Sequence, residues 1–219
     1  LRLQITNGLQ QAQIAVNCNP FITLIPIGNT NQRVNCGSAT VSMDEGTTQV
    51  LTSVDNINAV ATIKSGQTLT YDIVDDKLHI ETSGTGEIPL TINGEAFIVQ
   101  ADKTFSVSEV KIDIQPDNYP NTINCKTKKD SVIPVAILTT EDFDATTVDD
   151  KTVLFEGAAE AHGKRHEEDV DGDGDIDLMF HFRQNETTLS CNSTEATLAG
   201  RTFSGDLFIG TDSIDMKTK

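Results

Sequence analysis

The chain has 219 residues, with 33 acidic residues against 16 basic ones and a formal net charge of −17. A surface this negative repels nucleic acid and anionic lipid, so neither is expected as a partner. The length fits one large or two small domains, and no apolar run is long enough to cross a bilayer, so membrane insertion is not expected either.

The first half of the chain is expected to consist of β-strands. Leu1, Leu3 and Ile5 alternate with polar residues, which is the period-two pattern of a strand with one buried face. Asn93-Gly94 separates two further alternating runs and predicts a hairpin, because a type I′ turn needs positive φ at both central residues. The chain begins with Leu1 and shows no signal peptide, so we expect a processed or trimmed chain.

A second set of strands is expected from Val110 onward. Apolar and polar residues alternate over 110–114 and again over 176–182, and the stretch 132–138 is almost continuously apolar. No window has a convincing helical period, and the nearest helix candidate is a single turn over 141–144. We therefore predict an all-β protein.

The spacing of short strands and turn signals predicts two immunoglobulin-like β-sandwich domains in tandem. A polar stretch over 101–108 separates the two sets of strands and places the boundary near Glu109. The N-terminal domain is expected to span residues 1–108 and the C-terminal domain residues 109–219.

Four widely spaced cysteines indicate disulfide bonds: Cys18, Cys36, Cys125 and Cys191. None belongs to a C-x-x-C pair, so zinc-ribbon and thioredoxin-like sites are not expected. An even count in an acidic, threonine-rich chain predicts two disulfides, and the domain boundary leaves one pair in each half, Cys18–Cys36 and Cys125–Cys191. Other pairings, and four buried thiols, stay open on the sequence alone.

Two triplets are acceptor sequons for N-glycosylation. They are Asn185-Glu186-Thr187 and Asn192-Ser193-Thr194, so Asn185 and Asn192 are candidate glycosylation sites. Disulfides and glycans are both features of exported proteins. We therefore expect a secreted, extracellular protein of the cell surface.

The strongest chemical signal is the acidic loop over 169–177. Aspartates stand at positions 1, 3, 5 and 9 of a D-x-D-x-D-G-x-x-D pattern, and a fifth stands at position 7: Asp169, Asp171, Asp173, Asp177 and Asp175. Calcium takes about six to eight oxygen ligands, and alternating aspartates in a tight loop turn their carboxylates toward one centre. Gly174 permits the sharp bend, Asp175 is expected to offer its backbone carbonyl, and Asp177 is expected to bind directly or through water. The expected ion is Ca²⁺.

This loop differs from an EF-hand, which places a bidentate glutamate at position 12. Phe180 stands at that position, and the loop runs into a strand rather than a helix. Four other carboxylates are candidates for the missing ligand: Glu167, Glu168, Asp149 and Asp150. The alternative is a solvated acidic turn without metal, but aspartates at this density repel one another without a cation. We therefore expect a calcium ion that stabilises structure.

Several ordered motifs of the second half resemble a known family. They are Ile112-Asp113-Ile114-Gln115-Pro116, the stretch 132–138 (VIPVAIL), His162-Gly163-Lys164-Arg165-His166, the acidic loop, and His181-Phe182-Arg183. Over about residues 110–216 the chain resembles the C-terminal calcium-binding β-sandwich domain of secreted bacterial and archaeal surface proteins. The resemblance implies a small module of large exported proteins, with no established catalytic role to carry over and with Cys125 and Cys191 paired.

The expected function is that of an extracellular structural protein. We expect a calcium-stabilised subunit of a cell-surface layer, matrix or filament, which self-associates into a polymer or lattice. The predicted strand over 1–6 starts abruptly and could complete the sheet of a neighbouring copy, since an open edge offers main-chain hydrogen bonds. The alternative is that this strand pairs within its own domain.

A calcium-dependent carbohydrate-binding or adhesion module is the alternative function, with glycans as partners. Sugar platforms usually need an exposed Trp or Tyr on which the sugar stacks. This chain has no Trp and two tyrosines, Tyr71 and Tyr119, and Tyr71 lies in an alternating strand and is expected in the core. This residue inventory counts against a sugar platform.

An enzyme is not expected. His162, His166 and His181 flank the acidic loop, and the H-x-x-x-H pair of the first two could ligate a transition metal if it were helical. The sequence around Gly163 predicts a loop instead, and no nucleophile or general base has a visible partner. We expect these histidines to form hydrogen bonds that brace the loop.

Overall fold

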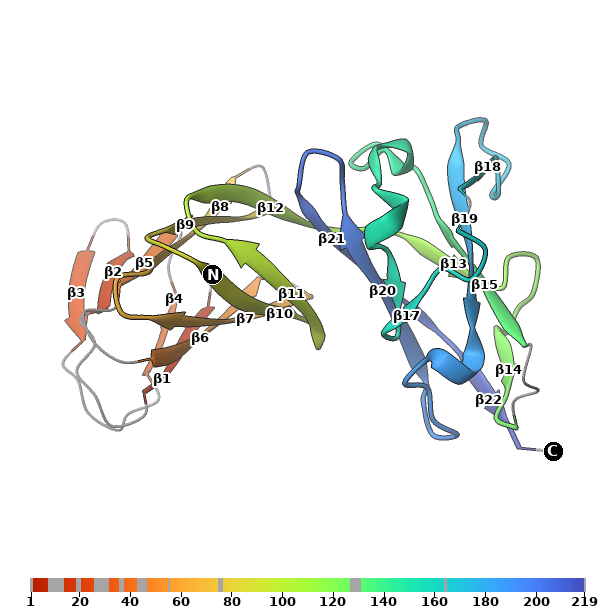
Figure 1. Ribbon diagram of the computed structural model, residues 1–219, viewed down its shortest axis with the longest axis horizontal. Helices are drawn as coiled ribbons and strands as arrows, with labels where there is room; N and C mark the ends of the chain where they lie inside the picture. The colour runs from red at the N-terminus through yellow and green to blue at the C-terminus, as the bar shows by residue number, and fades with distance from the viewer. Residues whose placement is uncertain are drawn as a thin grey trace. The chain divides into compact units, whose positions relative to one another are not determined.

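The computed structural model describes the backbone over 2–7, 14–18, 21–25, 32–35, 38–42, 47–54, 56–74, 77–126, 131–163 and 165–218. Side chains are described within these ranges from residue 40 onward, except at 42–48, 51 and 53–55. In these residues the regular structure is β, and the helices are three short 3₁₀ segments, so the all-β prediction is confirmed. The chain divides into two compact units, Leu1–Val107 (unit 1) and Ser108–Lys219 (unit 2), as Figure 1 shows. The immunoglobulin-like arrangement of the two halves stays a prediction.

Unit 1 contains a six-stranded antiparallel sheet. Its strands lie in the order β11 (Glu95–Gln100), β10 (Glu87–Ile92), β7 (Ile57–Lys64), β6 (Thr47–Val54), β1 (Arg2–Asn7) and β4 (Gln32–Asn35). Further strands follow in the order β12 (Lys103–Glu109), β9 (Lys77–Ser83), β8 (Thr68–Val74) and β5 (Ser38–Ser42), and β2 (Ile14–Cys18) pairs with β3 (Phe21–Ile25). Alternate residues of β7 and β10 are buried, as expected of strands that place one face on the core.

The predicted hairpin at Asn93-Gly94 is confirmed. Ile92 pairs with Glu95 across the turn, and φ is 48° at Asn93 and 96° at Gly94. Both values are positive, as a type I′ turn requires. The Asn93 side chain also holds the turn against the neighbouring strand, because its Oδ1 accepts a hydrogen bond of 2.7 Å from the backbone N–H of Asn58.

The N-terminal strand is paired inside its own sheet. β1 lies between β4 and β6, with Leu3 opposite Val34 on one side and Thr52 on the other. This arrangement corresponds to the second of the two alternatives for this strand. Donation of β1 to another copy would require it to leave both of these partners.

Unit 2 contains a four-stranded antiparallel sheet. Its strands lie in the order β13 (Ile112–Ile114), β15 (Val132–Ile137), β19 (Asp177–Arg183) and β18 (His166–Glu168). Other strands follow in the order β17 (Ala158–Ala159), β16 (Leu154–Phe155), β20 (Glu195–Arg201) and β21 (Leu207–Ser213), and β14 (Thr122–Asn124) pairs in parallel with β22 (Asp215–Lys217). The three 3₁₀ helices are η1 (Ala145–Thr147), η2 (Asp150–Thr152) and η3 (Gln184–Glu186).

The core of unit 2 draws on both sets of strands, which gives a β-sandwich-like fold. Phe180 and Phe182 of β19 are fully buried, and the ring centroid of Phe182 lies 5.2 Å from that of Phe155 on β16. Gly200 of β20 lies against Phe208, where a Cβ would come within 2.6 Å of the ring. A side chain at position 200 would therefore displace the core.

One of the two predicted disulfides lies within the described residues. Cys125 and Cys191 are bonded, with their Cα atoms 5.2 Å apart, so this pairing is confirmed. The pairing of Cys18 with Cys36 lies outside the described side chains.

The single helical turn predicted over 141–144 is wrong. Thr140 and Phe143 form a β-bridge across a tight turn, and the 3₁₀ helix η1 begins after it. The cap is Asp144, whose carboxylate accepts a hydrogen bond from the Thr146 N–H. Asp144 therefore stands just before η1 rather than inside a helical turn.

Candidate metal centre on the β18–β19 hairpin

The acidic loop connects β18 to β19. These two strands pair antiparallel, from His166 opposite Met179 to Glu168 opposite Asp177, and the loop over 169–176 closes the hairpin. The sequence prediction that the loop runs into a strand rather than a helix is confirmed. The hairpin therefore fixes both ends of the loop.

Hydrogen bonds from backbone N–H groups to aspartate side chains two or three residues earlier hold the loop in a tight turn. Asp169 Oδ1 accepts from the N–H of Gly172 at 2.8 Å, and Asp173 Oδ1 accepts from the N–H of Asp175 at 3.1 Å. Gly174 has a φ of +100°, a left-handed conformation that residues with a Cβ rarely adopt. The bend that the sequence assigned to Gly174 is therefore present.

Three of the five aspartates come together. Asp169, Asp171 and Asp177 each place one carboxylate oxygen so that all three oxygens lie within 4.8 Å of one another. This group could hold a metal ion, and its oxygen-only donor set is the kind that Ca²⁺ prefers. Asp173, whose carboxylate the sequence also proposed as a ligand, lies outside the group. Asp175 was expected to offer its backbone carbonyl, and its carboxylate is likewise outside the group.

Asp175 has an electrostatic environment that suits a cation. Its Oδ1 is buried and has no hydrogen-bond partner among the described residues. Burial raises the pKa of the Asp175 carboxyl, and the neighbouring charges of Asp173, Asp177 and Asp171 raise it further. An ion in the loop would supply the positive charge that these carboxylates lack.

Asp177 has a structural role that the sequence did not reveal. The residue is fully buried, and its two carboxylate oxygens accept hydrogen bonds from the backbone N–H groups of Thr139 and Val170, both at 2.8 Å. Thr139 in turn donates its hydroxyl to the carbonyl of Ile176 at 2.7 Å. Asp177 therefore ties the start and the end of the loop to the segment after β15.

The four carboxylates considered as the missing ligand lie outside the group. Glu167 forms an ion pair of 2.8 Å with Arg165, and Asp149 caps η2 by accepting from the Lys151 N–H. Glu168 lies on β18, and Asp150 is the first residue of η2. None of them joins the three aspartates among the described residues.

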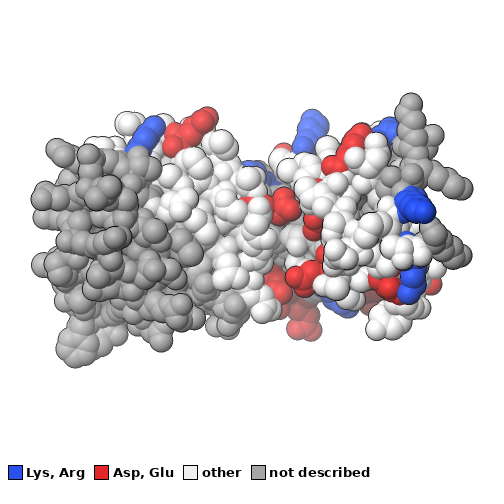
Figure 2. Space-filling model, turned by 90° about the horizontal axis from the view of Figure 1, so that it is seen from below, with Lys and Arg blue, Asp and Glu red and all other residues white. Residues whose placement is uncertain are grey.

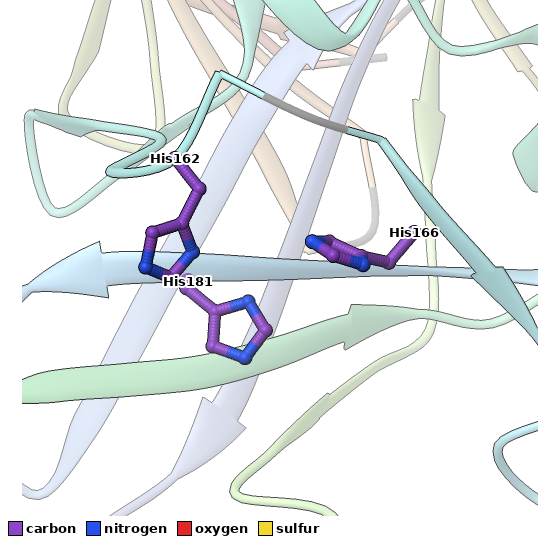
Figure 3. A group of neighbouring side chains, drawn as sticks. All are labelled: His162, His166 and His181. Atoms are coloured by element: carbon purple, nitrogen blue, oxygen red, sulfur yellow. The ribbon is translucent and has the colours of Figure 1, made fainter.

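The three histidines that flank the loop form a second cluster. His162, His166 and His181 each place one ring nitrogen so that the three nitrogens lie within 4.8 Å of one another. Figure 3 shows His162 and His166 approaching His181 from two different segments. The expectation of a loop at His166 is wrong, because this residue begins β18.

The environment of His181 favours its neutral form. Burial lowers the pKa of the His181 imidazole, and the neighbouring His162 and His166 lower it further, against smaller opposing effects of Glu160 and Glu168. The Nδ1 atom of His181 is buried without a hydrogen-bond partner among the described residues. The expected hydrogen-bonding role of this histidine is therefore not seen at Nδ1.

The candidate glycosylation sites and the two tyrosines differ in their exposure. Asn185 and Asn192 are exposed, as glycosylation requires. Tyr71 is fully buried, as expected, whereas Tyr119 is 93% exposed. Tyr119 borders an open pocket of about 500 Å³, which is lined by Gln115, Asn118, Tyr119, Pro120, Thr122 and Pro134.

Charged side chains are interspersed on the surface. On the face that Figure 2 shows, basic side chains are separated by neutral or acidic atoms, so no continuous basic patch forms among the described residues of this face. No helix in the described part of the chain is long and apolar enough to span a membrane. Comparison of the chain with protein-family models, with curated proteins and with solved structures gives no match in any of the three.

Proposed function

We propose that this chain is a calcium-stabilised structural subunit of an extracellular layer, matrix or filament, with Ca²⁺ held in the loop over 169–177. The observation that carries the proposal is the convergence of Asp169, Asp171 and Asp177, whose candidate ligand oxygens lie within 4.8 Å of one another. Their carboxylates repel one another in the absence of a cation, and Ca²⁺ accepts such hard oxygen ligands.

The ion would stabilise the hairpin by joining its two strands. Asp169 follows β18 directly, and Asp177 begins β19, so one ion bound to both residues closes the end of the hairpin. Asp177 also reaches Thr139, which extends the connection to a third segment of the chain. Binding to the folded state alone would add its free energy to the stability of unit 2.

An extracellular location is supported by two further observations. The Cys125–Cys191 disulfide closes a loop of the chain with a sequence separation of 66, and such bonds persist in oxidising compartments. The sequons at Asn185 and Asn192 are exposed. Ca²⁺ is abundant outside cells, where a weak site of this kind would be filled.

Self-association is tested by size-exclusion chromatography with light scattering, in millimolar calcium and again in excess chelator. We expect higher-order assemblies in calcium that dissociate in chelator, because the loop stiffens only when it is loaded. If assembly proceeds through the N-terminal strand, β1 must exchange its partners β4 and β6 for those of a neighbouring copy. A monomer in both buffers would contradict the structural-subunit proposal.

A second candidate function is carbohydrate binding at the pocket beside Tyr119. The ring is exposed, as a sugar-stacking platform requires, and the side chains of Gln115 and Asn118 offer hydrogen-bonding groups in the same pocket. A stacking platform of this kind needs no self-association of the chain.

A glycan array probed with the wild type and with Tyr119→Ala tests this second function. We expect a glycan bound by the wild type to lose about fivefold in affinity, since a stacking contact is worth about 1 kcal/mol. Phe203→Ala, which removes another exposed aromatic ring, is the matched control and should bind as the wild type does. Binding that is unaffected by Tyr119→Ala would reject this pocket as the site.

A further inference from the structure

Three separate segments bring the histidine cluster together. His181 lies in the middle of β19, and His166 lies on the adjacent strand β18, opposite Met179. The segment that carries His162 is held against β19 by a bridge between Glu160 and Phe182 and by a hydrogen bond of 2.7 Å from the Ala161 N–H to the His181 carbonyl. Backbone pairing, rather than side-chain flexibility, therefore places the three rings together.

The three imidazole nitrogens lie somewhat farther apart than the ligands of a bound metal ion, so small side-chain rotations must precede binding. The centroids of His162 and His166 lie 5.1 Å and 5.6 Å from that of His181, and the candidate nitrogens lie within 4.8 Å of one another. The nitrogens of a tetrahedral zinc site lie about 3.3 Å apart, because each Zn–N bond measures about 2.0–2.1 Å. His162 and His166 are exposed, so small rotations of their side chains can close this difference around the more buried His181.

Two buried polar atoms beside the cluster lack hydrogen-bond partners among the described residues. They are Nδ1 of His181 and Oε1 of Glu160. The Glu160 side chain is only 7% exposed, and its Oε1 lies 3.7 Å from Nδ1 of His162. A buried carboxylate oxygen and a buried imidazole nitrogen without hydrogen-bond partners are costly, and a divalent ion at the cluster would supply a positive charge beside the carboxylate.

The backbone holds Glu160 in this position. Its other oxygen, Oε2, accepts hydrogen bonds from the N–H groups of His162 and Gly163. The carboxylate is therefore anchored by the same segment that carries His162. This places a negative charge beside an imidazole, which is the usual arrangement around histidine ligands of metal ions.

We propose that His162, His166 and His181 form a transition-metal site, with Glu160 as the neighbouring carboxylate that offsets the charge of the ion. Three imidazoles suit a borderline-soft divalent ion such as Zn²⁺, whereas the oxygen-only loop suits Ca²⁺. The exposure of His162 and His166 leaves room for water or an outside ligand at a fourth position. The bound ion fastens the segment over 160–163 to the hairpin.

The test is a zinc titration of the full chain by calorimetry, in saturating calcium so that the acidic loop is occupied. We expect one equivalent of Zn²⁺ to bind the wild type and none to bind His162→Asn/His166→Asn. Both replaced side chains are exposed, so this double variant should fold, and its far-UV circular dichroism should match that of the wild type. His79→Asn removes the remaining histidine of the chain and should bind Zn²⁺ as the wild type does.

A second readout reports the coordination sphere directly. Co²⁺ in place of Zn²⁺ should give the visible d–d absorption of a low-coordinate nitrogen site in the wild type and in His79→Asn, and only the weak aqueous spectrum in the double variant. Asp171→Ala should keep the zinc site and lose the calcium response, so the failure of one site is distinguishable from the failure of the other. No zinc binding by the wild type, or equal binding by the double variant, would overturn the proposal.

Discussion

Replacing Asp177 with alanine is expected to lower the free energy of unfolding of unit 2 by about 3–5 kcal/mol, with or without calcium. The loss does not depend on the ion, because the buried Asp177 carboxylate accepts hydrogen bonds of 2.8 Å from the backbone N–H groups of Thr139 and Val170. Both donors lose a charged acceptor in the variant. Differential scanning calorimetry of the full chain, in calcium and in chelator, measures the loss.

The matched controls are two aspartate substitutions. Asp173→Ala removes an exposed loop carboxylate outside the converging group and should change the stability of the calcium-free chain by no more than about 0.5 kcal/mol. Asp177→Asn keeps one oxygen acceptor and should fall between the wild type and Asp177→Ala. A loss in Asp177→Ala that disappeared in chelator would show that Asp177 acts only as a calcium ligand.

Replacing Asp171 with alanine is expected to give the opposite pattern. Its Oδ1 accepts only a long hydrogen bond of 3.3 Å from the Asp173 N–H in an exposed part of the loop, so little folding energy depends on it without metal. With calcium at a hundredfold excess over the dissociation constant, the wild type gains about 3 kcal/mol from binding. The variant should lose most of this gain and melt with the wild type in chelator.

The control for Asp171→Ala is a substitution that removes the same charge elsewhere. Glu195→Ala takes one exposed carboxylate from the start of β20, outside the metal groups formed by the described residues. It should leave the calcium-dependent rise in melting temperature unchanged. Equal destabilisation of Asp171→Ala in calcium and in chelator would mean that the side chain supports folding and not the ion.

Local features were predictable because their causes lie within a few residues. The alternation around Asn93-Gly94 and the φ preferences of these two residues determine the hairpin without help from the rest of the chain. The strand character of 176–182 and the sharp bend at Gly174 follow in the same way. These predictions depend on the backbone conformation of residues that are close in sequence, which sequence patterns indicate well.

Apart from the Cys125–Cys191 disulfide, features that depend on contacts between distant segments were predicted less completely. The aspartate template treats positions 1, 3 and 5 alike, yet Asp173 lies outside the group while Asp177 is drawn into the interior by Thr139, which lies far away in sequence. The three histidines were recognised in the sequence, but a metal site was set aside because His162 and His166 were expected in a loop. The register of β18 on β19 brings His166 to His181, and this long-range pairing is not visible in the sequence.

Calcium titration of the chelator-treated chain by calorimetry tests the central claim most directly. We predict one saturable calcium site in the wild type, abolished in Asp169→Ala/Asp171→Ala and retained in Glu195→Ala. Asp169 and Asp171 supply two of the three converging carboxylates, so their loss leaves too few ligands for the ion. No saturable binding by the wild type, or binding of equal affinity by the double variant, would contradict a calcium site in this loop.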